Sequence, residues 1–143
     1  MPILFKGNGK FDFDIVGEKQ YQDCLDLIAG PKEPDGVNHE GVAILSYEND
    51  NKFDANAVAV FMLSKNNQPY PVGYLPKAEA AKFRSAFLQT GLGDDIKLCR
   101  ALVVGGWSNR EDKEWLGSDF VLDEGAYGVR LDLVFPLQSQ ILT

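Results

Sequence analysis

The sequence has few of the residues and patterns on which catalysis usually depends. It contains a single histidine, His39, and two cysteines, Cys24 and Cys99. One histidine and two distant cysteines do not supply the four ligands of a structural zinc site. The chain also lacks a Gly-x-Ser-x-Gly motif, a phosphate-binding glycine loop and a cluster of metal ligands. We therefore expect a protein that is not an enzyme, acts by binding and needs no cofactor.

Long hydrophobic segments are missing as well. No run of 18 apolar residues occurs, and a membrane-crossing helix needs about 20. Residues 1–6 lack the charged start and the long apolar segment of a signal peptide. Cys24 falls in a helical pattern and Cys99 in a strand pattern, which favours small buried side chains over a disulfide. The sequence thus predicts a cytoplasmic protein with no membrane partner.

Positive charge is in short supply over the chain as a whole. The sequence holds 14 Lys and Arg against 21 Asp and Glu, a net charge of −7, whereas proteins that bind nucleic acid usually carry a basic patch. The charge is uneven, because residues 64–104 hold 6 Lys and Arg against 3 Asp and Glu. An acidic shell argues against sliding on duplex DNA. It remains compatible with a small pocket that holds one or two nucleotides.

Short apolar segments predict a single domain built mainly of strands. With 45% hydrophobic residues, the chain is large enough to bury one core. Alternating or continuous apolar residues predict strands at 11–16, 42–47, 57–63, 72–75, 96–104 and 127–135. Helical spacing predicts helices over about 19–29 and 76–89. These elements favour a mixed α+β fold, mainly β, in the form of a small antiparallel-rich barrel.

Two details of this barrel follow from the same patterns. Gly73 lies inside a predicted strand, which indicates that another backbone segment approaches closely there. The alternation also predicts which side chains fill the barrel: Phe13, Ile15, Val58, Val60, Leu131 and Leu133.

The longest irregular segment is predicted between the last two strands, at residues 105–126. It carries Trp107, Trp115 and Phe120 among charged residues. A loop of this length is usually functional or an elaborated crossover. We interpret its tryptophans as cover for the barrel.

A second irregular segment, between the two central strands, contains one large aromatic residue in a polar setting. Asn and Asp side chains dominate it, and these hold irregular turns by bonding to nearby backbone. Phe53 lies in its middle and allows two interpretations. The ring either folds back as a plug over the core, or it presents a flat apolar face to a ligand beside Asn51 and Asp54.

Short motifs in and around this loop resemble those of the HIRAN domain. Residues 51–60 read NKFDANAVAV and residues 72–76 read VGYLP; residues 14–17 read DIVG, followed by Tyr21, and residues 128–133 read GVRLDL. Along the chain these motifs follow the order found in that family, and the resemblance extends over about residues 11–135. The chain therefore resembles a stand-alone, bacterial-type member of the family best known from fork-remodelling ATPases of the helicase-like transcription factor type. The resemblance implies one OB-like barrel of about six strands and two helices over residues 1–143.

The resemblance also implies a function, which is capture of the 3′ end of single-stranded DNA. In that family the terminal bases stack on aromatic rings and a carboxylate binds the free 3′-hydroxyl. The positions of this chain that match the family's binding residues are Val16, Gly17, Lys19, Gln20, Asn51, Phe53, Asp54, Tyr74 and Lys77.

Each matched position takes an implied role. Lys19 and Lys77 face phosphates, while Phe53 stacks on a base, a contact worth about 1–3 kcal/mol whatever the base. Asp54 accepts a hydrogen bond from the 3′-hydroxyl and would repel a phosphate in its place. Asn51 adds a polar contact, and residues 16–17 line the pocket.

The chain departs from the family pattern at three of these positions. Gln20 stands where eukaryotic members have a second stacking aromatic residue, Phe53 lacks the hydroxyl of a tyrosine, and Tyr74 replaces a polar ring. Tyr21 and Tyr74 are the nearby rings that could take the missing place, and the sequence does not position them.

A second interpretation keeps the barrel and drops the nucleic acid. The acidic balance and the tryptophan-bearing loop at 105–126 fit a protein-interaction or accessory module. The first interpretation predicts a role on stalled or damaged replication intermediates in DNA repair, with a helicase or nuclease as a partner; the second predicts a protein partner alone.

Overall fold

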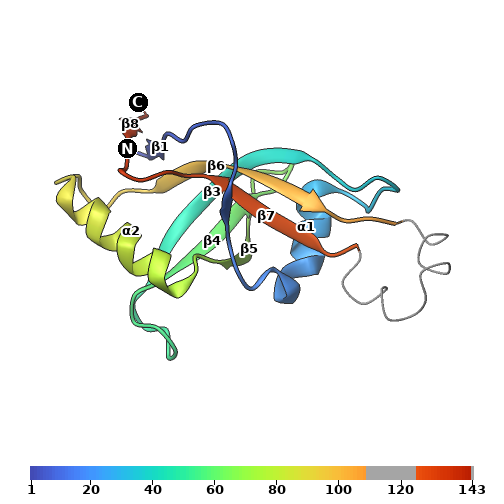
Figure 1. Cartoon of the computed structure of the whole chain (residues 1–143), viewed down its shortest axis with the longest axis horizontal. Coiled ribbons are helices and arrows are strands. Elements are labelled where there is room, and N and C mark those ends of the chain that lie inside the picture. Colours follow the sequence, from blue (N-terminus) through green and yellow to red (C-terminus); the bar gives the residue numbers. More distant parts are fainter. Residues whose placement is uncertain (109–124, 143) are drawn as a thin grey trace.

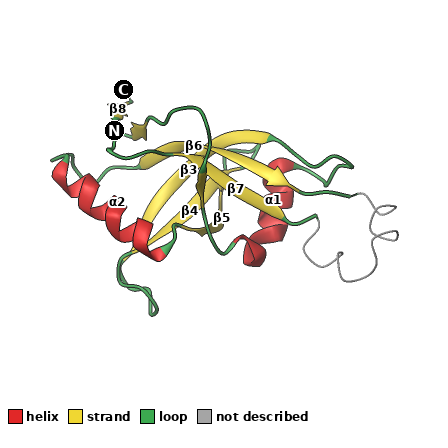
Figure 2. Ribbon diagram, viewed as in Figure 1, coloured by secondary structure: helices red, strands yellow, loops and turns green. Residues whose placement is uncertain are grey.

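The structure, a computed structural model, describes residues 1–108 and 125–142. Within them the chain is mainly β (Figure 2). The strands are β1 (Ile3–Phe5), β2 (Phe13–Asp14), β3 (His39–Glu48), β4 (Ala57–Leu63), β5 (Pro69–Tyr74), β6 (Lys97–Gly105), β7 (Tyr127–Asp132) and β8 (Ser139–Ile141). The helical elements are a 3₁₀ turn η1 (Glu18–Tyr21), α1 (Gln22–Ala29) and α2 (Lys77–Gln89). The predicted α+β class, mainly β with two helices, is confirmed.

One curled sheet forms the body of the molecule (Figure 1). Its strands follow the order β2-β7-β6-β3-β4-β5, and each pairing along this path is antiparallel. Val16 follows β2, and Tyr74 ends β5 at the opposite edge. Their backbones exchange two hydrogen bonds, Val16 N to Tyr74 O and Tyr74 N to Val16 O, each 2.8 Å long. This bridge, which we call the barrel closure, joins the two edges and gives the sheet its OB-like barrel form.

A glycine makes the barrel closure possible. A Cβ atom at Gly73 would lie 2.5 Å from the carbonyl oxygen of Val16, which is closer than any side chain can be. The backbones therefore approach there as the sequence predicts.

Two short strands extend the sheet beyond the six predicted ones. β1 pairs in parallel with β6 and antiparallel with β8. Ile3 and Phe5 of β1 are buried, so this strand is part of the core. Three residues are too few to display the alternation from which strands are predicted.

The core fills the barrel and continues beneath α2. Of the predicted core residues, Phe13 is half-buried and packs against the others, which are fully buried. Phe83 and Phe87 of α2 meet Phe5 edge to face, with ring centroids 5.3 and 5.9 Å apart, a favoured aromatic geometry. These contacts fix α2 against the barrel.

The predicted strand over residues 11–16 needs correction, and most of the predicted loop over residues 105–126 cannot be compared with the structure. The predicted strand over residues 11–16 is only Phe13–Asp14, because Phe11 has a φ of 50° and leaves the extended conformation. Most of the segment 105–126, with Trp115 and Phe120, lies outside the described residues. Trp107 is described and is 48% exposed. Among the described helices, none is both long and apolar enough to cross a membrane.

Candidate functional site

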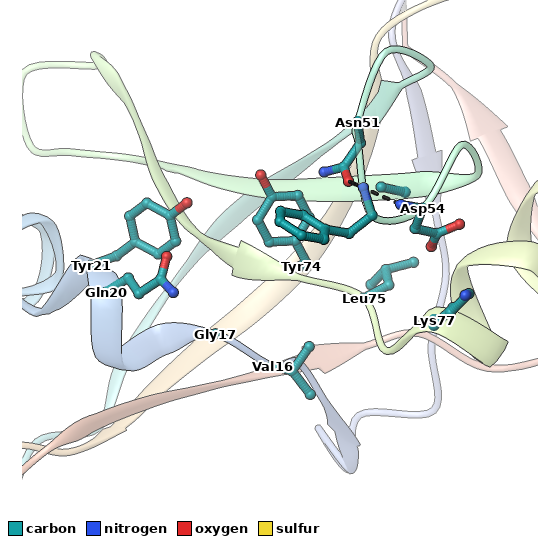
Figure 3. A pocket seen from close by; sticks show the side chains of 11 residues that line it. Val16, Gly17, Gln20, Tyr21, Asn51, Asp54, Tyr74, Leu75 and Lys77 are labelled. Atoms are coloured by element: carbon teal, nitrogen blue, oxygen red, sulfur yellow. Dashed lines mark hydrogen bonds between the residues drawn. The ribbon is translucent and has the colours of Figure 1, made fainter.

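A pocket of about 480 Å³ opens beside the barrel closure (Figure 3). Its volume lies in the range of small-molecule sites. Three parts of the chain meet there: the closure segment with η1, the β3–β4 loop, and the end of β5 with the start of α2. The residues that line it are Val16, Gly17, Gln20, Tyr21, Asn51, Phe53, Asp54, Ala57, Tyr74, Leu75 and Lys77.

This pocket brings together eight of the nine residues that the HIRAN resemblance implies. The exception is Lys19, which is exposed on η1 beside Gln20 and does not line the pocket. The matched positions come from segments separated by up to about 60 residues, and the barrel closure is what unites them. Their roles toward DNA remain predictions.

Side-chain hydrogen bonds give the β3–β4 loop a defined shape. Asn51 Oδ1 accepts from the backbone N–H groups of Phe53 and Asp54, at 2.9 and 3.0 Å, and Asn51 Nδ2 donates to Glu48 Oε1 at 3.0 Å. Asp54 Oδ1 accepts from the N–H of Asn56 at 2.9 Å. Both lone pairs of the Asn51 oxygen are therefore occupied within the loop. Asn51 shapes the loop, in addition to any contact that its amide makes with a ligand.

Phe53 projects from this loop and is 91% exposed. The interpretation of its ring as a core plug is wrong, because the turn held by Asn51 directs the ring into the pocket rim instead of the barrel. Burying a Phe side chain is worth about 1.5–3 kcal/mol, so a ring this exposed favours any ligand that covers it. The geometry agrees with the flat-face interpretation.

Tyr74 presents its ring to the pocket while its hydroxyl is engaged elsewhere. The hydroxyl donates to the Glu48 carboxylate, with oxygen–oxygen distances of 3.0 and 3.1 Å. Burial first, and then this carboxylate, raise the pKa of Tyr74 to about 12, with a smaller contribution from Tyr21. The ring is therefore neutral at physiological pH. Its hydroxyl belongs to the scaffold of the loop.

A third aromatic ring reaches the pocket from η1. Tyr21 lies beside Gln20, toward the side of the pocket away from Asp54 and Lys77 (Figure 3). Both rings named as substitutes for the missing aromatic at Gln20, Tyr21 and Tyr74, thus line the pocket. Sequence reasoning named Tyr21 without placing it, because its side-chain direction depends on the 3₁₀ turn.

The two charged residues that line the pocket, Asp54 and Lys77, lie at the end of the pocket nearest α2 (Figure 3). Lys77 is the first residue of that helix and is exposed, and Asp54 lies on the loop that faces it (Figure 3). One cation outside the pocket lining, Arg84, bonds to the loop from two turns along α2, and sequence reasoning missed it. Among the described residues, no group of three His, Cys, Asp or Glu is placed to hold a metal ion.

Comparisons of the chain with protein-family models, with curated proteins and with solved structures found no match. The HIRAN resemblance therefore remains a hypothesis. It rests on the motifs of the sequence and on the way the matched residues gather at one pocket.

Proposed function

We propose that this chain is a HIRAN-like, non-catalytic module that captures the 3′ end of single-stranded DNA in the pocket beside the barrel closure. One observation carries the proposal: residues matched from three separate motifs line a single pocket, and its rim carries a flat ring that is 91% exposed. Free 3′ ends of this kind occur on stalled or damaged replication intermediates. A helicase or nuclease is the partner class that would use such a module.

Aromatic rings supply the affinity in this proposal. Phe53, Tyr74 and Tyr21 all line the pocket, and in this proposal they are the rings on which bases stack. Stacking contributes about 1–3 kcal/mol per base and tolerates any base. The pocket would therefore bind ends without reading their sequence.

Asp54 and Lys77 supply the selectivity for an end. A carboxylate accepts a hydrogen bond from a terminal 3′-hydroxyl and repels a 3′-phosphate. Lys77 lines the pocket at the start of α2 and suits the phosphate that precedes the terminal sugar. With only one or two phosphates neutralised, the affinity should fall only gently with salt, with a logarithmic slope of about −1.

The test compares short single-stranded oligonucleotides that differ only at their ends. Fluorescence titrations should give tight binding with a free 3′-hydroxyl and weaker binding with a 3′-phosphate. An oligonucleotide with a free 3′-hydroxyl and a 5′-phosphate should bind as tightly as the one without any terminal phosphate. Asp54→Asn should reduce the discrimination between the two 3′ ends. The control is Asp50→Asn, which makes the same charge change in the same loop at an exposed position that does not line the pocket.

Two results would contradict the proposal. Equal affinity for hydroxyl and phosphate ends would remove the 3′-end selectivity. No binding to any oligonucleotide would favour the protein-interaction module instead, with the exposed ring of Phe53 as a contact for a protein partner.

A further inference from the structure

One side chain ties the β3–β4 loop to α2. The guanidinium of Arg84 donates from Nε to the carbonyl oxygen of Asn56 at 2.8 Å and from Nη2 to the carbonyl oxygen of Ala57 at 2.7 Å. A third bond runs from Nη1 to Asn49 Oδ1 at 2.6 Å. The three acceptors lie at both ends of the loop that carries Phe53. Arg84 therefore grips the base of this loop.

The grip is anchored in the core of the barrel. The guanidinium lies 4.1 Å from the centroid of the Tyr47 ring, a distance at which a cation and a ring attract each other. Tyr47 in turn meets the buried ring of Phe83 edge to face, with centroids 6.4 Å apart. The guanidinium of Arg84 thus packs against the Tyr47 ring, and its three hydrogen bonds hold the loop against this packed group.

The same helix also carries Lys77. Arg84 follows Lys77 by seven positions, which is two helical turns or roughly 10 Å along the helix axis. Lys77 lines the pocket at the start of the helix, and Arg84 holds the loop that supplies Phe53 and Asp54. The relative positions of these three pocket residues therefore depend on one helix and one guanidinium.

We infer that Arg84 is a positioning residue of the proposed site, which holds the loop on α2 so that Phe53 and Asp54 face Lys77 before a ligand arrives. The inference rests on the proposed function for its effect on binding. Three of the five N–H donors of Arg84 are used within the protein, and it does not line the pocket. Its role is preorganisation, which strengthens binding by ordering the loop in advance.

The first measurement needs no ligand. Amide hydrogen exchange should be followed at Phe53, Asp54 and Ala57, whose N–H groups are bonded within the loop. Arg84→Met removes the three bonds, and Arg84→Lys keeps the charge but cannot reach three acceptors with one nitrogen. Both variants should exchange faster at these amides. Exchange at the Tyr74 amide, which belongs to the barrel closure, should not change and reports that the barrel is intact.

The second measurement uses the short oligonucleotide with a free 3′-hydroxyl. Both variants should bind it about tenfold more weakly, because ordering even one residue of backbone on binding opposes it by roughly that factor. The salt slope should stay at its wild-type value, since no phosphate contact is lost. The control is Lys65→Met, which removes the same charge on the exposed β4–β5 turn, at the other end of both strands from Ala57 and Tyr74.

Each other outcome overturns either the inference or the function. Unchanged loop exchange in Arg84→Met would show that Arg84 does not order the loop. Full affinity in Arg84→Lys would show that only its charge matters, and a salt slope smaller in magnitude by about 0.7 would show that it contacts a phosphate. If the wild-type protein binds no oligonucleotide, the proposed function fails. The exchange rates alone then decide whether Arg84 orders the loop.

Discussion

Replacing Phe53 with alanine separates a binding role from a structural one, because the structure predicts a small loss of stability and a large loss of affinity. Deleting a fully buried Phe destabilises a protein by about 3–5 kcal/mol. Phe53 is 91% exposed and buries only about a tenth of its side chain, so its loss should lower the free energy of unfolding by less than about 0.5 kcal/mol.

The expected effect on binding is much larger. If one base stacks on the ring, Phe53→Ala should weaken oligonucleotide binding by about 1–3 kcal/mol, or roughly five- to 150-fold. Phe53→Tyr keeps the flat face and should keep the affinity. Phe53→Leu keeps much of the apolar surface without the flat ring, and its affinity should fall close to that of the alanine variant.

The assay combines urea denaturation and fluorescence titration on the same preparations. Leu88→Ala is the matched control, since Leu88 is 81% exposed and lies at the far end of α2 from the pocket. It should change neither quantity. A loss of several kcal/mol of unfolding free energy in Phe53→Ala would mean that the ring packs in the core. Unchanged affinity together with unchanged stability would refute its role as a stacking platform.

Three further predictions follow from individual residues. Gly73→Ala should destabilise the fold by about 1–3 kcal/mol, since the new methyl group would press on the carbonyl oxygen of Val16; urea denaturation measures it, and an unaltered midpoint would contradict it. The pKa of Tyr74 is raised from 10.0 to about 12, so the protonated hydroxyl stabilises the fold fully below pH 10, and this stabilisation is lost as the pH rises to about 12. Between pH 10 and 12 the free energy of unfolding, measured by urea denaturation, should therefore fall less in Tyr74→Phe than in the wild type. An equal fall in both proteins would argue against the bond to the carboxylate. Burial raises the pKa of the Cys99 thiol to about 12, so a thiol reagent should label the half-buried Cys24 and spare Cys99 in the native protein, as mass spectrometry can check.

The regular elements of the fold were predictable where local pattern and local contacts agree. β4 is apolar on both faces and reads as a continuous buried run, while α2 shows Ala80, Phe83 and Phe87 on one side. Such periodicity depends only on neighbours a few residues away. β1 has three residues and forms only through partners about 90 or more residues away. A pattern of that length carries no recognisable period.

The burial of a polar residue, Asp132, also depends on distant contacts that the local pattern does not reveal. Alternation along residues 127–135 puts Asp132 on the outer face of its strand, yet only 4% of it is exposed. The segment before β2 crosses over this position, and the N–H of Gly9 donates to the Asp132 carboxylate at 2.9 Å. A Cβ at Gly7 would overlap that carboxylate, at 2.1 Å from Oδ1. Only the path of the distant N-terminal segment decides that this side chain is buried.

For the candidate site, motif matching named the residues and the structure supplied their arrangement. Asn51 and Asp54 belong to one turn, so their proximity follows from the sequence. The approach of Gln20 and Tyr21 to that turn does not, because it requires the barrel closure. Arg84 could not be found at all from the sequence, since its partners are the carbonyl oxygens of a loop 27 or more positions away.

The location of the pocket at the barrel closure links its stability to its function. Closing the barrel requires Val16 and Tyr74 to pair, and the same two residues form part of the pocket wall. The bridge is isolated, with one residue on each side, so it is held by few contacts of its own. A ligand that covers both residues would stabilise the closed form by mass action. Binding should therefore slow amide exchange at Val16 and Tyr74 as well as at the loop, which places barrel closure and ligand capture in one equilibrium.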